Sequence, residues 1–106
     1  MARILAIGGA HIDHTGRLDA AHRPGASNPG RWVSEPGGGA FNAARNLARL
    51  GHHVTMVSPR GGDAAAAQVA EAAEAAGIED CPLTFLDRAT PSYTAILEPH
   101  GNLVTA

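Results

Sequence analysis

Two side chains that can bind hydroxyl groups stand close to glycine-rich turns in this sequence. Asp13 follows the apolar run 3–9, and Asn42 follows the glycine run 37–39. A carboxylate accepts strong hydrogen bonds from hydroxyl groups, and a carboxamide both donates and accepts. These residues indicate a site for a hydroxyl-rich ligand, although each alone also fits a turn-capping Asp or a solvent-facing Asn.

The glycines Gly38 and Gly39 precede a helical pattern that runs to Leu50. The first N–H groups of a helix have no partner within it and lie at the positive end of its dipole. Glycine also lets a ligand approach the backbone closely. The pattern predicts that this helix terminus contacts an anion or a hydroxyl-rich ligand, and a flexible start to the helix is the alternative for a glycine cluster alone.

A βαβ arrangement would position these residues. The continuous apolar run 3–9 is typical of a central parallel strand covered on both faces. A helix from 39 or 40 to 50, ended by Gly51, leads to a second strand at 53–58. Ligands of open α/β sheets bind at the carboxyl ends of the strands, which is where Asp13 stands.

The remaining segments predict further strands and one more helix. Segment 10–36 is too long for a structureless loop and indicates a functional insertion with short β-like patches at 15–18 and 31–34. Asp63 is expected to cap a helix that ends at Gly77, and a third strand is expected at 82–86. Segments 92–97 and 103–105 predict a hairpin, within whose second strand the chain stops, so we expect a truncated chain.

The spacing of the glycines carries a family resemblance. The stretch 38–44 reads Gly-Gly-Ala-Phe-Asn-Ala-Ala, and Gly51 and Gly61 follow after six and nine further residues. This resembles the first signature of the PfkB carbohydrate kinases. The Ile-Asp step at 12–13 and the lid-like insertion agree with it, and the stretches 27–30 and 90–93 look most like those of pseudouridine kinases. The resemblance covers the whole chain but only the N-terminal part of such a kinase.

The resemblance implies an α/β, ribokinase-like fold. A partial, mainly parallel central sheet would be flanked by helices, and β-lid strands would come from about 14–36 and 92–106. The complete enzyme would use ATP and Mg²⁺ to phosphorylate a hydroxyl group of a sugar or nucleoside, with a ribosyl compound such as pseudouridine as substrate. The lid often serves such kinases as a homodimer surface.

Substrate-binding roles also follow from the resemblance. Asp13 and Asn42 would bind sugar hydroxyls, and Gly38 and Gly39 would pack their backbone against the sugar. His11 stands where family members often carry Asn, so it could contact a hydroxyl or a base but departs from the usual pattern.

The second family signature, Asp-Thr-x-Gly-Ala-Gly-Asp, does not occur in these 106 residues. It would supply the catalytic base and the anion hole, so we expect no catalytic residue here. ATP and Mg²⁺ would belong to the complete enzyme, and this chain alone would bind neither and be inactive. A non-catalytic small-molecule binding half that pairs with a second chain, or an interaction module derived from a kinase, is the alternative function.

Composition narrows the other possibilities. The net charge is −2 and the eight Lys and Arg are dispersed, which argues against nucleic acid as a partner. No stretch is long and apolar enough for a signal peptide or a membrane span. The single Cys81 is expected to be a small buried side chain in a reducing cytoplasm.

The sequence offers two alternative kinds of site, a metal site and a dinucleotide-binding turn. His11, Asp13 and His14 are of types that bind zinc, but neighbours on a strand point to opposite sides. Gly8-Gly9-Ala10 could belong to a dinucleotide-binding turn, but that fingerprint requires a helix directly after it. Segment 11–36 follows instead, so we reject the dinucleotide reading and prefer histidines on the surface or in contact with a ligand to a metal site.

Overall fold

The computed structural model describes residues 1–106 and divides into two compact units. Unit 1 comprises Met1–Ile12 and Pro36–Pro91, and unit 2 comprises Asp13–Glu35 and Ser92–Ala106. The chain therefore passes between the units after Ile12, after Glu35 and after Pro91.

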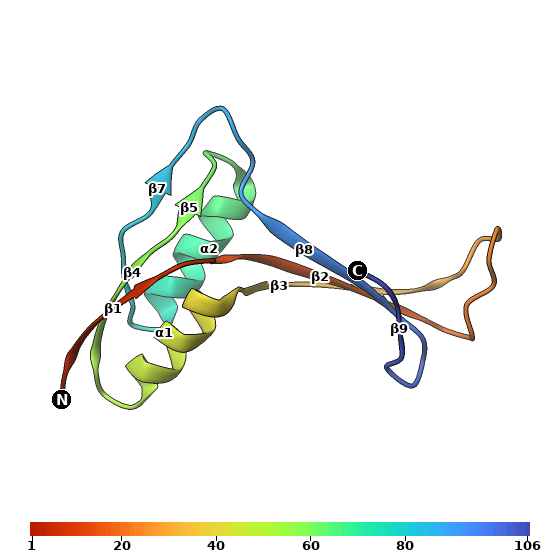
Figure 1. Ribbon diagram of the computed structural model, residues 1–106, viewed down its shortest axis with the longest axis horizontal. Helices are drawn as coiled ribbons and strands as arrows, with labels where there is room; N and C mark the ends of the chain where they lie inside the picture. Colours follow the sequence, from red (N-terminus) through yellow and green to blue (C-terminus); the bar gives the residue numbers. More distant parts are fainter. The chain divides into compact units, whose positions relative to one another are not determined.

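Unit 1 contains a parallel sheet (Figure 1). Its strands are β1 (Arg3–Ile7), β4 (His53–Val57) and β6 (Glu79–Asp80), in the order β1-β4-β6. A second parallel pair joins β5 (Pro59–Arg60) to β7 (Leu83–Thr84). The strands expected at 3–9 and 53–58 are thus confirmed, and they pair with each other in parallel, Ile4 opposite Val54.

The strand expected at 82–86 is wrong in its extent. Within that range only β7 is a strand; the short strand β6 precedes it, and Cys81 and Pro82 lie between the two. Proline has no N–H to donate, whereas Cys81 N–H donates to Met56 O at 2.8 Å and Leu83 N–H donates to Ser58 O at 2.8 Å. These donors are alternate residues, so an N–H at position 82 would point away from this neighbour, and the backbone ladder passes through the proline without losing a hydrogen bond.

Two helices pack on this sheet, α1 (Gly39–Arg49) and α2 (Ala64–Ala75). Both end as the sequence predicts, since Gly51 and Gly77 follow with φ of +92° and +76°. Asp63 caps α2, and its Oδ1 accepts a hydrogen bond from Ala66 N–H at 2.9 Å.

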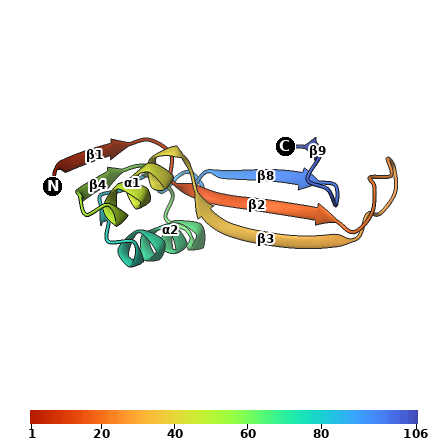
Figure 2. The same cartoon turned by 90° about the horizontal axis from the view of Figure 1, so that it is seen from below.

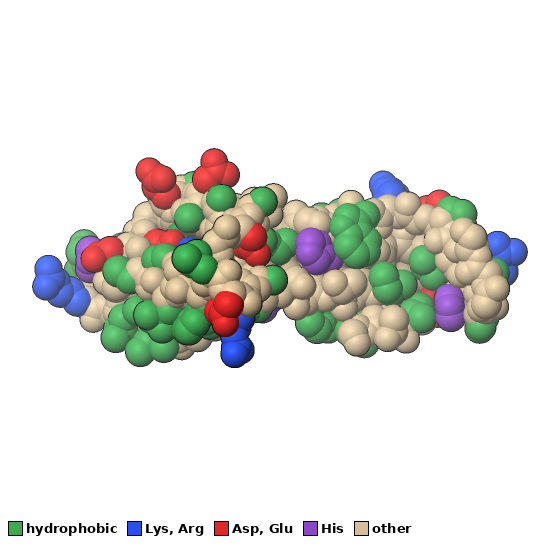
Figure 3. Space-filling model, turned by 90° about the horizontal axis from the view of Figure 1, so that it is seen from above, with side chains coloured by type: hydrophobic (Ala, Val, Ile, Leu, Met, Phe, Trp, Pro, Cys, Tyr) green, Lys and Arg blue, Asp and Glu red, His purple; other side chains and the backbone are tan.

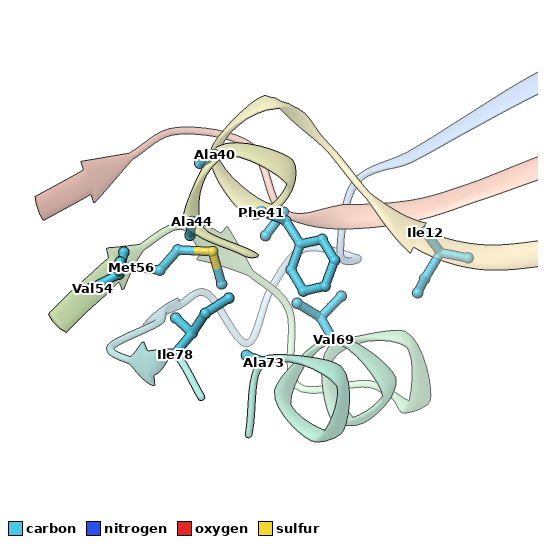
Figure 4. Packing of buried hydrophobic residues seen from close by; sticks show 10 residues of the cluster. Ile12, Ala40, Phe41, Ala44, Val54, Met56, Val69, Ala73 and Ile78 are labelled. Carbon is cyan, nitrogen blue, oxygen red and sulfur yellow. The ribbon is translucent and has the colours of Figure 1, made fainter. Parts of the chain in front are cut away.

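The hydrophobic core lies between these helices and one face of the sheet (Figure 4). Phe41 and Ala44 come from α1, and Val69 and Ala73 come from α2. They pack against Val54 and Met56 of β4 and against Ile78, which directly precedes β6. Burial of this apolar surface holds unit 1 together.

The opposite face of the sheet is open. Its odd-numbered side chains include Leu5 and Ile7, which are 58% and 71% exposed. Within residues 1–106, β1 is an edge strand and both helices cover the even-numbered face, so the expected cover on both faces is not formed by these residues. Cys81 lies at an odd position too, which explains why it is exposed rather than buried.

Unit 2 is built on a four-stranded sheet in the order β3-β2-β8-β9. The strands are β2 (His11–Leu18), β3 (Gly30–Gly37), β8 (Ser92–Leu97) and β9 (Leu103–Thr105). Figure 2 shows β2 and β8 running in the same direction and β3 running in the opposite one. The hairpin of β8 and β9 is antiparallel as expected, whereas the patches at 15–18 and 31–34 prove to be parts of longer strands.

Neither helix of the structure is long and apolar enough to cross a membrane.

Two substitutions on neighbouring strands test the one-sided packing of unit 1. Met56→Ala is expected to lower the free energy of unfolding by about 2–5 kcal/mol, because the Met56 side chain is completely buried. Leu5→Ala is expected to change it by less than about 0.5 kcal/mol, because Leu5 lies on the open face. Urea denaturation followed by circular dichroism measures both, and equal losses would contradict the packing described here.

Candidate functional site

The end of β1 is tied to the start of α1 through one carbonyl group. Gly9 O accepts hydrogen bonds from Ala40 N–H at 3.0 Å and from Phe41 N–H at 3.3 Å. The first turn of the helix is thus partly satisfied by protein. This corrects the expectation of a cluster of unpaired N–H groups at the terminus, and with two donors already engaged the helix is a poorer anion site than its glycines suggest.

Gly38 makes this junction sterically possible. It is buried, its φ is +101°, and a Cβ atom added to it would lie 2.5 Å from Gly9 O and 3.1 Å from His11 Nδ1. Only glycine fits both the backbone conformation and the space. The same distances place the His11 ring beside Gly38, so the structure brings these two predicted residues together.

Gly39 differs from its neighbour. It is exposed, and a Cβ atom added to it would meet no heavy atom within 4 Å. The protein itself therefore does not require glycine at this position. The space beside Gly39 is not filled by other protein atoms.

Asn42 is exposed in the first turn of α1. Its Oδ1 accepts a hydrogen bond from Arg45 Nη2 at 3.2 Å, and the Arg45 guanidinium lies 5.2 Å from the centre of the Phe41 ring. Arg45 thus orients the amide and holds its oxygen, which leaves the amide N–H groups as the donors that Asn42 can present.

Asp13 is the first residue of unit 2 and lies in β2, partly buried. Alternation along the strand puts it on the same side of β2 as Thr15 and Arg17. On that face of the unit 2 sheet, residues Thr15, Arg17, Arg31, Val33, Glu35 and Leu97 line a hollow of about 590 Å³. Asp13 therefore belongs to the polar face of this sheet.

His14 points to the other side of β2. Its Nδ1 lies 2.7 Å from Ser34 Oγ, and its ring stacks on Trp32 with 5.4 Å between ring centres. Figure 3 shows histidine and hydrophobic side chains next to each other on one face of the molecule. No group of three or more His, Cys, Asp and Glu side chains in the structure could hold a metal ion. His14, a ligand in the zinc alternative, contacts Ser34 and Trp32 instead.

Comparison with known proteins decides the family. Residues 1–104 match the pfkB family carbohydrate kinase. The chain belongs to this family. Among curated proteins, this pfkB chain is 31% identical over 104 residues to the pseudouridine kinase of Escherichia coli strain K12, covering 97% of the chain and 33% of that protein.

Solved structures confirm the ribokinase-like α/β fold of the pfkB chain. A carbohydrate kinase from Agrobacterium tumefaciens is 63% identical with a TM-score of 0.90, covering 99% of this chain and 34% of that one. A ribokinase from Cryptococcus neoformans in complex with ADP is 26% identical with a TM-score of 0.81, covering 99% of this chain and 33% of that one. The pfkB chain thus spans about a third of the length of these relatives.

The sequence did not reveal two elements of the junction. One is the contact of the Gly9 carbonyl with the helix, for which the Gly8-Gly9 pair directly after β1 was a signal, because paired glycines allow the backbone to approach another element closely. The contact of Arg45 with Asn42 was the other, and the spacing of three residues between them on the helix could have indicated it.

The two glycines give a matched pair of substitutions. Gly38→Ala is expected to cost on the order of 1–3 kcal/mol of folding free energy from its positive φ alone, and the approach to Gly9 O adds to that cost. Gly39→Ala is expected to be neutral or to stabilise by up to about 1 kcal/mol. Thermal or urea denaturation measures both variants, and a Gly39→Ala variant as unstable as Gly38→Ala would refute this distinction.

Proposed function

We propose that the chain is the sugar-binding part of an ATP-dependent sugar or nucleoside kinase whose acceptor is a ribosyl compound such as pseudouridine. The observation that carries the proposal is the junction of β1 and α1, where the His11 ring lies beside Gly38, the space at Gly39 is open, and Asn42 lies in the first turn of the helix. The identity to a protein named pseudouridine kinase supports the choice of acceptor.

Each predicted residue has a chemical role in this proposal. The Asp13 carboxylate accepts hydrogen bonds from sugar hydroxyls, and the Asn42 amide donates to another. The backbone at Gly38 and Gly39 packs against the sugar, which a side chain at Gly39 would block. His11 replaces the usual Asn and contacts a hydroxyl or the base, so it is the residue through which the acceptor would differ from that of other family members.

Phosphoryl transfer would need parts that this chain does not supply. ATP and Mg²⁺ serve the complete enzyme: ADP is bound in the Cryptococcus neoformans ribokinase, and the metal would neutralise charge on the phosphates. These 106 residues hold neither a cluster of metal-binding side chains nor the second family signature. We therefore propose that the chain binds the acceptor and does not by itself activate it.

Unit 2 is proposed to be the lid of this kinase. Its two segments, 13–35 and 92–106, form one sheet of their own, as expected of a cover that excludes water from the transfer. A cytoplasmic location is proposed as well, and the free thiol of Cys81 fits a reducing compartment.

Calorimetric titration with pseudouridine tests the proposed function. Asp13→Asn is expected to weaken binding about ten- to hundredfold, because a hydrogen bond to a charged group contributes about 1.5–3 kcal/mol. Gly39→Ala is expected to lose binding while remaining folded. Asp19→Asn, which changes an exposed carboxylate of the same unit, serves as the control and should bind normally.

Equal affinity of the Asp13→Asn and Asp19→Asn variants would reject the assigned role of Asp13. In the same preparations, no ATP-dependent phosphorylation of pseudouridine by the 106-residue chain is expected. Phosphorylation detected with radiolabelled ATP would show that the chain is catalytically complete and would reject that part of the proposal.

We also propose that unit 2 binds a second copy of the chain through the face that carries Trp32. Trp32 packs over Gly16, whose added Cβ would lie 3.4 Å from the indole ring, and stacks on His14, yet it remains 59% exposed. A rigid, flat, exposed aromatic side chain is a favoured anchor of protein interfaces.

Trp32→Ser is expected to shift the chain towards the monomer in sedimentation equilibrium by at least about tenfold in the dissociation constant. Tyr93→Ser is the matched control, since Tyr93 is 51% exposed and alternation places it on the other face of the same sheet. A monomeric native chain, or a larger effect of Tyr93→Ser, would contradict the proposed interface.

A further inference from the structure

Thr90 is a buried polar residue that the proposed sugar site does not use. It is 6% exposed, and its hydroxyl accepts a hydrogen bond from Gly61 N–H at 3.0 Å and donates one to Asp63 Oδ1 at 2.6 Å. Thr90 N–H donates to Asp63 Oδ2 at 2.9 Å. Both oxygens of Asp63 are therefore engaged by Thr90, and the two residues are joined although 27 positions separate them.

Gly61 shows how closely the segment before β8 is seated. A Cβ atom added to Gly61 would overlap Arg88 O and would lie 2.9 Å from Thr90 N. Gly61 is also buried. The Gly61-Gly62-Asp63 turn thus forms a cradle for segment 88–90 as well as the start of α2, which is a second reason for glycine at this position of the family signature.

The residue after Thr90 is where the chain leaves unit 1. Pro91 is the last residue of that unit, and β8 of unit 2 begins at Ser92. Pro91 O accepts a hydrogen bond from Ile12 N–H at 3.4 Å, and Ile12 is itself the last residue of unit 1 before Asp13. Two of the passages between the units are therefore held together within unit 1, next to Thr90.

The segment is also stiff. Proline fixes its own φ, and it restricts the preceding residue, Thr90, to extended conformations. With its φ fixed and its N–H, hydroxyl and neighbouring carbonyl all hydrogen-bonded, the segment has few ways to move while Asp63 holds it.

The hydrogen bonds to Asp63 favour its charged form. The Thr90 hydroxyl, followed by the backbone N–H groups of Thr90 and Ala66, lowers the pKa of Asp63 from its ordinary 3.8 to about 2. The carboxylate is therefore charged and accepting hydrogen bonds throughout the neutral pH range.

We propose that Asp63 and Thr90 form a clamp that fixes the root of β8, and that sugar binding depends on this strand being fixed. The two are positioning residues, since they act through β8 and do not touch the sugar. The part of this inference that concerns sugar rests on the proposed function, whereas the part that concerns β8 does not.

Hydrogen exchange of the 106-residue chain, measured residue by residue by NMR, tests the clamp. Thr90→Val keeps the side-chain shape and removes the hydroxyl. It is expected to speed exchange of the β8 amides at least about tenfold while those of β4 stay unchanged. Thr90→Ser, which restores the hydroxyl, is expected to return β8 to native protection, and Thr84→Val, at an exposed threonine of unit 1, should leave it unchanged.

Two results would overturn the clamp. Native protection of β8 in Thr90→Val would show that the contacts do not hold its root, and equal acceleration in β4 and β8 would show that they only stabilise unit 1. A titration with pseudouridine on the same variants separates the two proposals. Weakened affinity in Thr90→Val with recovery in Thr90→Ser supports positioning, and unchanged affinity overturns it. If the native chain does not bind pseudouridine but the hydrogen-exchange results are as expected, the proposed sugar function is rejected and the anchoring of β8 by Asp63 and Thr90 stands.

Discussion

The hydrogen bonds from Ala40 and Phe41 to the carbonyl of Gly9 are the contact on which the site depends. They join the end of β1 to the first turn of α1, and that approach requires Gly38, where any side chain would meet the same carbonyl. Phe41 then enters the core between the two helices, where it is 2% exposed. The residues that pack the core and those that border the open space at Gly39 are therefore set by one junction.

The sheet of unit 1 imposes a second constraint. Parallel sheets are normally covered on both faces, and here α1 and α2 cover the even-numbered side chains while Leu5, Ile7 and Leu83 stay exposed. The chain spans about a third of the length of its relatives, and a layer that covered this face would come from outside these residues.

Much of this architecture could be predicted because it follows from local rules. Asp63 marks the start of α2, and glycines with positive φ mark the ends of both helices. Apolar runs after each turn indicate the parallel strands. The family was readable from the spacing of glycines, since each fills a position where a side chain would disturb the backbone or its neighbours.

What could not be predicted depends on contacts distant in the sequence. Asp63 was recognisable as a helix cap, but nothing in the sequence indicated that its second oxygen binds Thr90. The exposure of Cys81 depends on which face of the sheet the helices cover, and an apolar run gives no information about that. The hydrogen bonds from the first N–H groups of α1 to the Gly9 carbonyl likewise could not be predicted, because they depend on how closely β1 and α1 approach in the folded chain.

A map of amide chemical shifts of the isotope-labelled chain during titration with pseudouridine tests the proposed sugar site most directly. We expect the shifts to concentrate at the proposed contact residues His11, Asp13, Gly39 and Asn42. Shifts confined to other surfaces, such as the open face around Leu5 and Ile7, would contradict the proposed sugar site.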